Sequence, residues 1–139
     1  MEDVYSKTGI SVIDKHHEKM LSVISELSET MKNNECDLML VNVFQKLLFY
    51  AENYFIEEEY LMQRFVYQEF GKHKNEHKEF VEELNKFQET YSQGGDCICD
   101  GLLKFLQQWY KKHIINYDNT VVDFLKTKII EHNEIQHLS

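Results

Sequence analysis

The chain has 139 residues, a formal net charge of −9 and 42% hydrophobic residues. This length and apolar content suit one globular domain with its own core, and they exclude a disordered chain. The acidic balance argues against nucleic acid or an anionic membrane surface as a partner. Because the sequence has no proline and only five glycines, it favours helix.

Two further features of the sequence limit the class of protein to which the chain can belong. No apolar run is long enough for a membrane span, and the start MEDVYSK does not resemble a signal peptide. We therefore expect a cytoplasmic protein with no membrane partner. Cys36, Cys97 and Cys99 are too few for a disulfide framework, so ordinary thiols are expected. A reversible link from Cys36 to Cys97 or Cys99 is a conceivable alternative.

Four segments, taken in chain order, repeat apolar residues three and four positions apart, which is the period of a helix with one buried face. They run from Ile13 to Met31, Phe44 to Phe65, Phe70 to Tyr91 and Leu102 to His113. The breaks NNEC, VYQEFG and SQGGD separate them. Short loops make neighbouring helices antiparallel. The sequence thus predicts an all-α fold, an up-down-up-down antiparallel four-helix bundle.

The C-terminal part of the sequence adds one short element. A short amphipathic helix is expected near residues 119–130, where it would close one end of the bundle. The expected domain spans residues 1–131. Residues 132–139 form a polar tail, which we expect to fray.

Polar residues interrupt the apolar faces of all four predicted helices at one height of the bundle. These residues are His17, Tyr54, Glu58, His73, His77, His113 and, just beyond the fourth helix, Asp118. A buried carboxylate is costly without a partner, and so many inward-facing polar groups need a common one. A metal centre is the interpretation we favour, and a purely hydrogen-bonded network is its alternative.

The spacing of these residues resembles that of the hemerythrin family. The family pattern is a histidine after an aspartate, then H-F-x-x-E, H-x-x-x-H and H-x-x-x-x-D on successive helices. The corresponding stretches here are IDKHH, YFIEE, HKNEH and HIINYD. In the first of them, the D-x-x-H spacing selects His17 and not His16.

This resemblance implies two non-heme irons joined by carboxylates and an oxo or hydroxo group. Glu58 and Asp118 would be the bridging carboxylates. One iron would be held by three histidines, namely His73, His77 and His113. The other iron would be held by His17 and the second-helix residue, with an open position for dioxygen or a related small ligand. An oxygen-binding, carrier-type function is the leading expectation.

Tyr54 departs from the family pattern, because it stands where the family has the histidine of H-F-x-x-E. Its phenolate could bind iron, which is the interpretation we favour, or its hydroxyl could hydrogen-bond a metal-bound water. The third alternative is core packing. A phenolate ligand would favour ferric iron. Two other functions therefore remain open: an enzyme acting on peroxide or nitric oxide, and a module that stores iron or senses iron, oxygen or redox state.

The polar residues beside the predicted ligands are assigned to the surface. His16, His132 and His137 lie off the buried faces, and Glu57 and Glu59 flank Glu58 on what we expect to be a solvated helix face.

Overall fold

The computed structural model describes residues 8–95, 98–113 and 119–138, and these are almost entirely helical. The elements are α1 (Ser11–Lys32), α2 (Cys36–Tyr50), η2 (Ala51–Phe55), α3 (Ile56–Arg64), α4 (Phe70–Ser92), α5 (Ile98–Trp109) and α6 (Asn119–Leu138). No strand occurs among the described residues. The predicted all-α fold is confirmed, and the observed loops lie within the predicted breaks.

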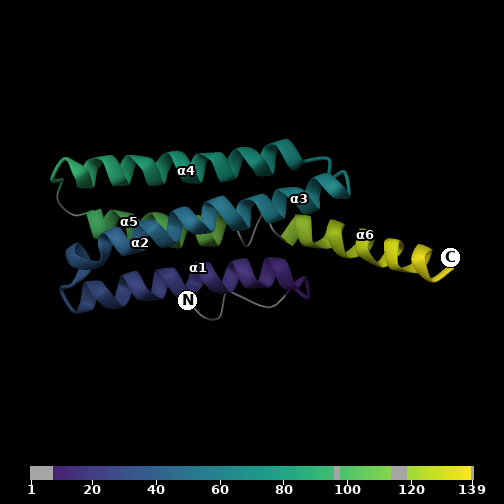
Figure 1. Cartoon of the computed structure of the whole chain (residues 1–139), viewed down its shortest axis with the longest axis horizontal. Coiled ribbons are helices and arrows are strands. Elements are labelled where there is room, and N and C mark those ends of the chain that lie inside the picture. The colour runs from purple at the N-terminus through teal and green to yellow at the C-terminus, as the bar shows by residue number, and fades with distance from the viewer. Residues whose placement is uncertain (1–7, 96–97, 114–118, 139) are drawn as a thin grey trace.

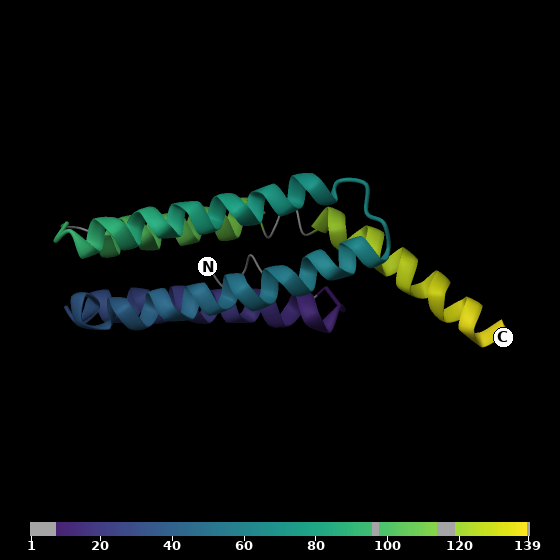
Figure 2. The ribbon, with the colours of Figure 1, turned by 45° about the horizontal axis from the view of Figure 1, so that its top comes forward.

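Four long rods form the bundle, because α2, η2 and α3 join end to end as one helix (Figure 1). Successive rods run in opposite directions. The pair formed by α1 and α2–α3 lies beside the pair formed by α4 and α5 (Figure 2). Helix α1 packs against both α2 and α5, and α4 packs against both α3 and α5. The up-down-up-down arrangement therefore brings residues near the start of α1 and α4 level with the end of α3.

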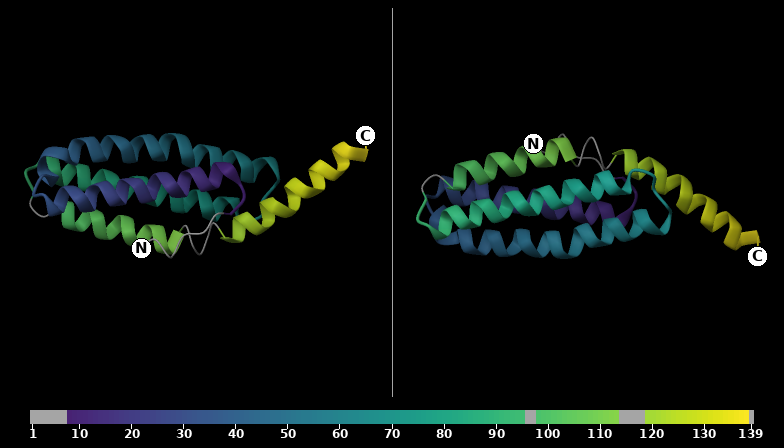
Figure 3. Two further views of the ribbon diagram at one scale, coloured as in Figure 1. Left: turned by 90° about the horizontal axis from the view of Figure 1, so that it is seen from below. Right: turned by 90° about the horizontal axis from the view of Figure 1, so that it is seen from above.

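Helix α6 packs against α3 and then projects beyond the bundle (Figure 3). The sequence predicts a short helix near 119–130 and a frayed tail, but helix α6 continues to Leu138. The helix is thus longer than expected, because the segment IIEHNEIQHL contains helix formers such as glutamate and leucine and no proline or glycine. None of the helices in the described part of the chain is long and apolar enough to cross a membrane.

The core consists of two apolar clusters separated along the bundle. The larger one contains, among others, Met20, Leu27, Leu47, Phe55, Phe80, Leu106 and Trp109. The smaller one, beneath the start of α6, contains Ile10, Ile13, Met62, Val121, Val122 and Leu125. On α1, His17 lies between Ile13 and Met20. On the second rod, Glu58 lies between Phe55 and Met62. The polar layer is thus enclosed by apolar side chains on both sides.

The second rod contains a wide, π-helical turn at Ala51–Phe55. Because a π turn holds more residues than an α turn, both Tyr54 and Phe55 are buried there. Beyond it, Met62 is fully buried, whereas Leu61 and Phe65 on the predicted face are only half-buried. The buried face that the sequence predicts for this helix therefore holds as far as Glu58, and it is wrong at Leu61 and Phe65.

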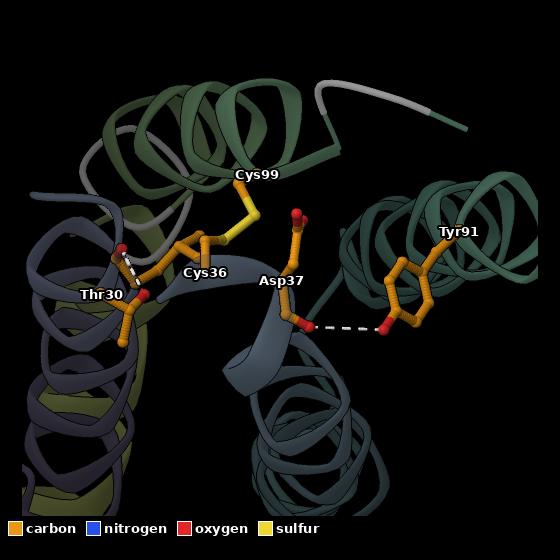
Figure 4. The surroundings of a disulfide bond; sticks show 6 residues. Thr30, Cys36, Asp37, Tyr91 and Cys99 are labelled. Carbon is orange, nitrogen blue, oxygen red and sulfur yellow. Dashed lines mark hydrogen bonds between the residues drawn. A yellow bond between two sulfur atoms is a disulfide. The ribbon is translucent and has the colours of Figure 1, made fainter. Parts of the chain in front are cut away.

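Cys36 and Cys99 form a disulfide, so the expectation of ordinary thiols is wrong for this pair (Figure 4). Their Cα atoms are 6.4 Å apart, and the bond joins the first turn of α2 to the first turn of α5. Beside it, the Tyr91 hydroxyl donates a hydrogen bond of 3.4 Å to the Asp37 carbonyl. Cys97 lies outside the described residues.

Candidate metal centre

Four buried side chains bring their donor atoms together inside the bundle. They are Glu58 of α3, His73 and His77 of α4, and His113 in the π-helical turn that follows α5. One ligand atom from each lies within 4.8 Å of all the others, and every one of these residues is at most 5% exposed. The period of each helix points these residues inward, and the antiparallel packing brings them to the same level.

The Glu58 carboxylate sits in the middle of the cluster and faces two sides. Its Oε1 lies 3.3 Å from Nε2 of His73 and 3.3 Å from Nε2 of His77. Its Oε2 lies 2.5 Å from Nδ1 of His16 on α1. The two oxygens of one carboxylate therefore face separate sets of imidazoles, which is the arrangement that a bridging carboxylate requires.

The electrostatics of the cluster favour protonation states that suit metal ligands. Burial by itself raises the pKa of Glu58, but hydrogen bonds from His16, His73 and His77 outweigh it and hold that pKa well below its ordinary value. Burial, together with repulsion from His77 and His73, lowers the pKa of His113 well below its ordinary value. An ionised carboxylate and a neutral imidazole are the forms that bind metal ions.

The lowered pKa of His113 makes a prediction for the metal-free chain. Between the ordinary histidine pKa of about 6.5 and the lower pKa in the folded state, the unfolded chain binds a proton that the folded chain does not. Stability should therefore fall as pH drops below about 6.5, by up to about 1.4 kcal/mol per pH unit for this one group. Glu58 adds to the loss only below about 4.3, its ordinary range.

Urea unfolding of the metal-free protein at several pH values measures this slope. His113→Phe should be less sensitive to pH between about 6.5 and 5 than the wild-type chain. Equal slopes in the two proteins would show that His113 is protonated as easily in the folded state as in the unfolded one.

His77 is held in place from both sides of its ring. Its Nδ1 lies 2.9 Å from Oε2 of Glu59, so it can donate a proton there and leave Nε2 directed at Glu58. Phe55 stacks on the His77 ring at 3.9 Å with parallel planes. A carboxylate behind a histidine is a common way to orient a metal ligand. Glu59, expected on a solvated face, instead has a side chain only 19% exposed.

His16 is fully buried, so its assignment to the surface is wrong. Its Nδ1 contacts Glu58, and its Nε2 lies 3.4 Å from Oε2 of the half-exposed Glu57. Its ring stacks on Tyr54, with centroids 4.5 Å apart and planes 17° apart. The signal in the sequence is the His16–His17 doublet itself, because α1 has two neighbouring rods and each histidine can face one of them.

The remaining predicted residues have the following places. His17 is 2% exposed and is one of the neighbours that contribute to the lowered pKa of His113, so it lies on the polar layer. Tyr54 is 7% exposed and lies on the His16 side. Asp118 lies outside the described residues, and the side chains of His132 and His137 are not described.

The donors suit an intermediate transition metal. Imidazoles and a carboxylate, without thiolates, are ligands that iron and zinc accept. Trp109 stacks on the His113 ring at 4.4 Å, so a second histidine of the centre is braced by an aromatic side chain. The donors are thus buried and oriented, and the lowered pKa values of Glu58 and His113 favour the forms of these two residues that bind a metal ion.

Comparison with known proteins agrees with this donor set. The family model described as the hemerythrin HHE cation binding domain matches residues 8–125. The bacteriohemerythrin of Pseudomonas aeruginosa (strain LESB58) is 30% identical over 124 residues, which cover 89% of this chain and 80% of that protein. The bacteriohemerythrin of Clostridium acetobutylicum is 30% identical over 122 residues, 83% of this chain and 92% of that protein. The bacteriohemerythrin of Aquifex aeolicus is 25% identical over 127 residues, 86% and 92% of the two chains. With its buried histidine and glutamate cluster on a four-helix bundle, this chain belongs to the hemerythrin family.

Proposed function

We propose that the chain binds two irons and uses them to bind dioxygen or a related small ligand. The observation that carries this proposal is the two-sided Glu58, whose oxygens face His73 and His77 on one side and His16 on the other. A site for one metal ion would not need a histidine such as His16 facing the second carboxylate oxygen of Glu58. The family match adds a cation-binding domain of the same kind.

In this proposal, His73, His77 and His113 hold one iron, and Glu58 bridges it to the second. His17 belongs to the second iron. Asp118 is proposed as the other bridge from its spacing after His113 in the sequence. Phenolate ligation by Tyr54 stays a prediction, since its described contacts are made by its ring.

Bound iron would supply a reducible centre with an open position for a small ligand. The protein's own part is to keep this centre dry and in place. The clusters around Phe55 and Met62 close the polar layer from both sides, which limits the entry of water. Glu59 and Phe55 fix the His77 ring, and Trp109 fixes that of His113. A rigid, enclosed site of this kind suits the binding of a small molecule.

Iron content and visible spectra of the purified protein test the proposal. Elemental analysis should find about two irons per chain, as expected for a carboxylate-bridged centre. After anaerobic reduction, air should produce a new visible absorption that disappears when dioxygen is removed. One metal per chain, or zinc after growth with ample iron, would argue against the two-iron centre. Irreversible oxidation by air would instead favour the enzymatic alternative with peroxide or nitric oxide.

A cytoplasmic location is also proposed. A disulfide such as Cys36–Cys99 is uncommon in that reducing compartment, so finding this pair oxidised in freshly lysed cells would argue against the location, and finding it as thiols would support it.

A further inference from the structure

We propose that His16 is a ligand of the second iron, bound through Nδ1, and that it replaces the histidine that this chain lacks at position 54. The inference rests on the proposed two-iron centre. Tyr54 then acts as a positioning residue, whose ring face holds the His16 imidazole.

The first support is the contact between His16 and Glu58. Nδ1 of His16 lies 2.5 Å from Oε2, the carboxylate oxygen directed away from His73 and His77. Two donors of one ion, with bonds of about 2.0–2.2 Å at right angles, lie about 3 Å apart. If the two atoms move slightly further apart, a metal ion can bind between them.

The second support is a repeated pattern around three consecutive glutamates. Glu59 receives Nδ1–H of His77, and the other nitrogen of that ring faces Glu58. On the opposite side, Glu57 lies near Nε2 of His16, and the other nitrogen of that ring faces Glu58. Both histidines therefore have one nitrogen at the central carboxylate and the other at an outer one. A carboxylate behind the ring is typical of histidine ligands to metals.

The third support is the position of α1. Helix α1 packs against the α2–α3 rod and against α5. Consecutive residues of a helix point about 100° apart, so His16 and His17 can both be buried. His16 faces Glu58 and Tyr54 on the α2–α3 rod, and His17, the next residue, is also buried at 2% exposure. The doublet can therefore supply two imidazoles where the family pattern takes one.

Tyr54 is placed to support His16 by its ring. The two rings stack at 4.5 Å. The Tyr54 ring is itself fixed by edge contacts from Tyr50 at 5.2 Å and Phe49 at 6.2 Å. A histidine at position 54 would direct its own nitrogen at the second iron. A tyrosine there instead offers a flat surface against which an imidazole from α1 can pack.

The alternative role for His16 is a hydrogen bond that only neutralises Glu58. His16→Gln separates the two roles, because a glutamine amide can still donate to Oε2 but is a poor ligand for iron. If His16 is a ligand, His16→Gln should hold about one iron per chain where the wild-type protein holds two. Far-ultraviolet circular dichroism should show unchanged helix. The matched control, Glu18→Gln, changes an exposed residue of the same helix and should keep both irons.

Rescue with imidazole gives a second measurement on a second variant. His16→Ala leaves a ring-shaped space beside Tyr54, and free imidazole can enter it. Added imidazole should return the iron content of His16→Ala from about one to about two per chain. The same addition should leave His16→Gln unchanged, since its side chain fills the space.

Tyr54→Phe completes the test, because it removes the phenol oxygen and keeps the stacked ring. It should retain both irons and the visible spectrum of the wild-type protein. Two irons in His16→Gln would overturn the role of His16 while leaving the two-iron proposal intact. Loss of an iron or of a broad visible band in Tyr54→Phe alone would identify Tyr54 as the ligand instead. A wild-type protein with fewer than two irons would overturn both proposals.

Discussion

Glu58→Ala is expected to lose both metal ions, the largest effect of any single substitution in this chain. One of its carboxylate oxygens faces His73 and His77 and the other faces His16, so its loss affects both sides of the centre. Replacing it also leaves buried imidazoles with fewer partners, at a cost of about 1–3 kcal/mol in the free energy of unfolding. Elemental analysis after iron reconstitution should find well below one iron per chain.

Two other glutamates of the same rod are controls of graded severity. Glu52→Gln changes an exposed residue of the π-helical turn and should keep the full iron content. Glu59→Gln removes the charge behind His77 and should weaken iron binding by about 10- to 100-fold, which is visible in competition with a chelator. If Glu58→Ala kept one tightly bound iron, the three histidines would be a sufficient site on their own, and Glu58 would not be a bridge.

Removal of the metal is expected to lower the melting temperature by about 8–16 °C. A ligand present at about 1,000 times its dissociation constant stabilises the fold by about 4 kcal/mol. For a domain of this size, each kcal/mol shifts the melting temperature by about 2–4 °C. The metal-free chain must keep the Glu58 carboxylate and five imidazoles buried, with only one another and the outer carboxylates Glu57 and Glu59 as the partners described for them.

Calorimetry of the iron-loaded protein and of protein stripped by reduction and chelation measures this difference. His73→Ala, which removes one ligand, should melt close to the stripped protein whether or not iron is added. If the loaded and stripped wild-type proteins melt at the same temperature, the polar layer is fully satisfied by its internal hydrogen bonds.

The sequence predicts the buried polar layer well because helical periodicity carries strong information. His17, Glu58, His73, His77 and His113 fall in step with apolar neighbours, and all of them are buried. The predicted loops are short, so neighbouring helices have to run antiparallel. A polar residue in step with an apolar face is thus a reliable sign of burial in a helical bundle.

Residues next to the periodic buried positions are those whose burial the sequence did not predict. His16 is one position from a seam residue, and a single helical face leaves no room for both members of the doublet. It is buried because α1 touches two rods, which is a property of the packing. Glu59 was missed for the same reason, since its partner His77 comes from another helix. Spacing within one segment does not report such contacts.

The Cys36–Cys99 link was only an alternative in the sequence analysis, because the pairing of cysteines depends on distance in space. Cys36 and Cys99 are 63 positions apart in the chain, and only the alignment of the α2 and α5 ends brings their Cα atoms to 6.4 Å. With three cysteines, the sequence offers several pairings and no means of choosing between them.

The wide turn at Ala51–Phe55 also decides which changes in chain length this rod accepts. An α-helix turns by about 100° per residue, and a π turn absorbs one additional residue while the residues after it keep nearly the directions that they would have in a regular α-helix. Deleting one residue of this turn would therefore allow a regular helix in which Glu58 still faces the axis of the bundle. Inserting one more residue as regular helix would instead rotate all later side chains by about 100° and turn Glu58 away from that axis. The rod should therefore tolerate the loss of one residue here better than the gain of one, although the turn itself contributes no described metal donor.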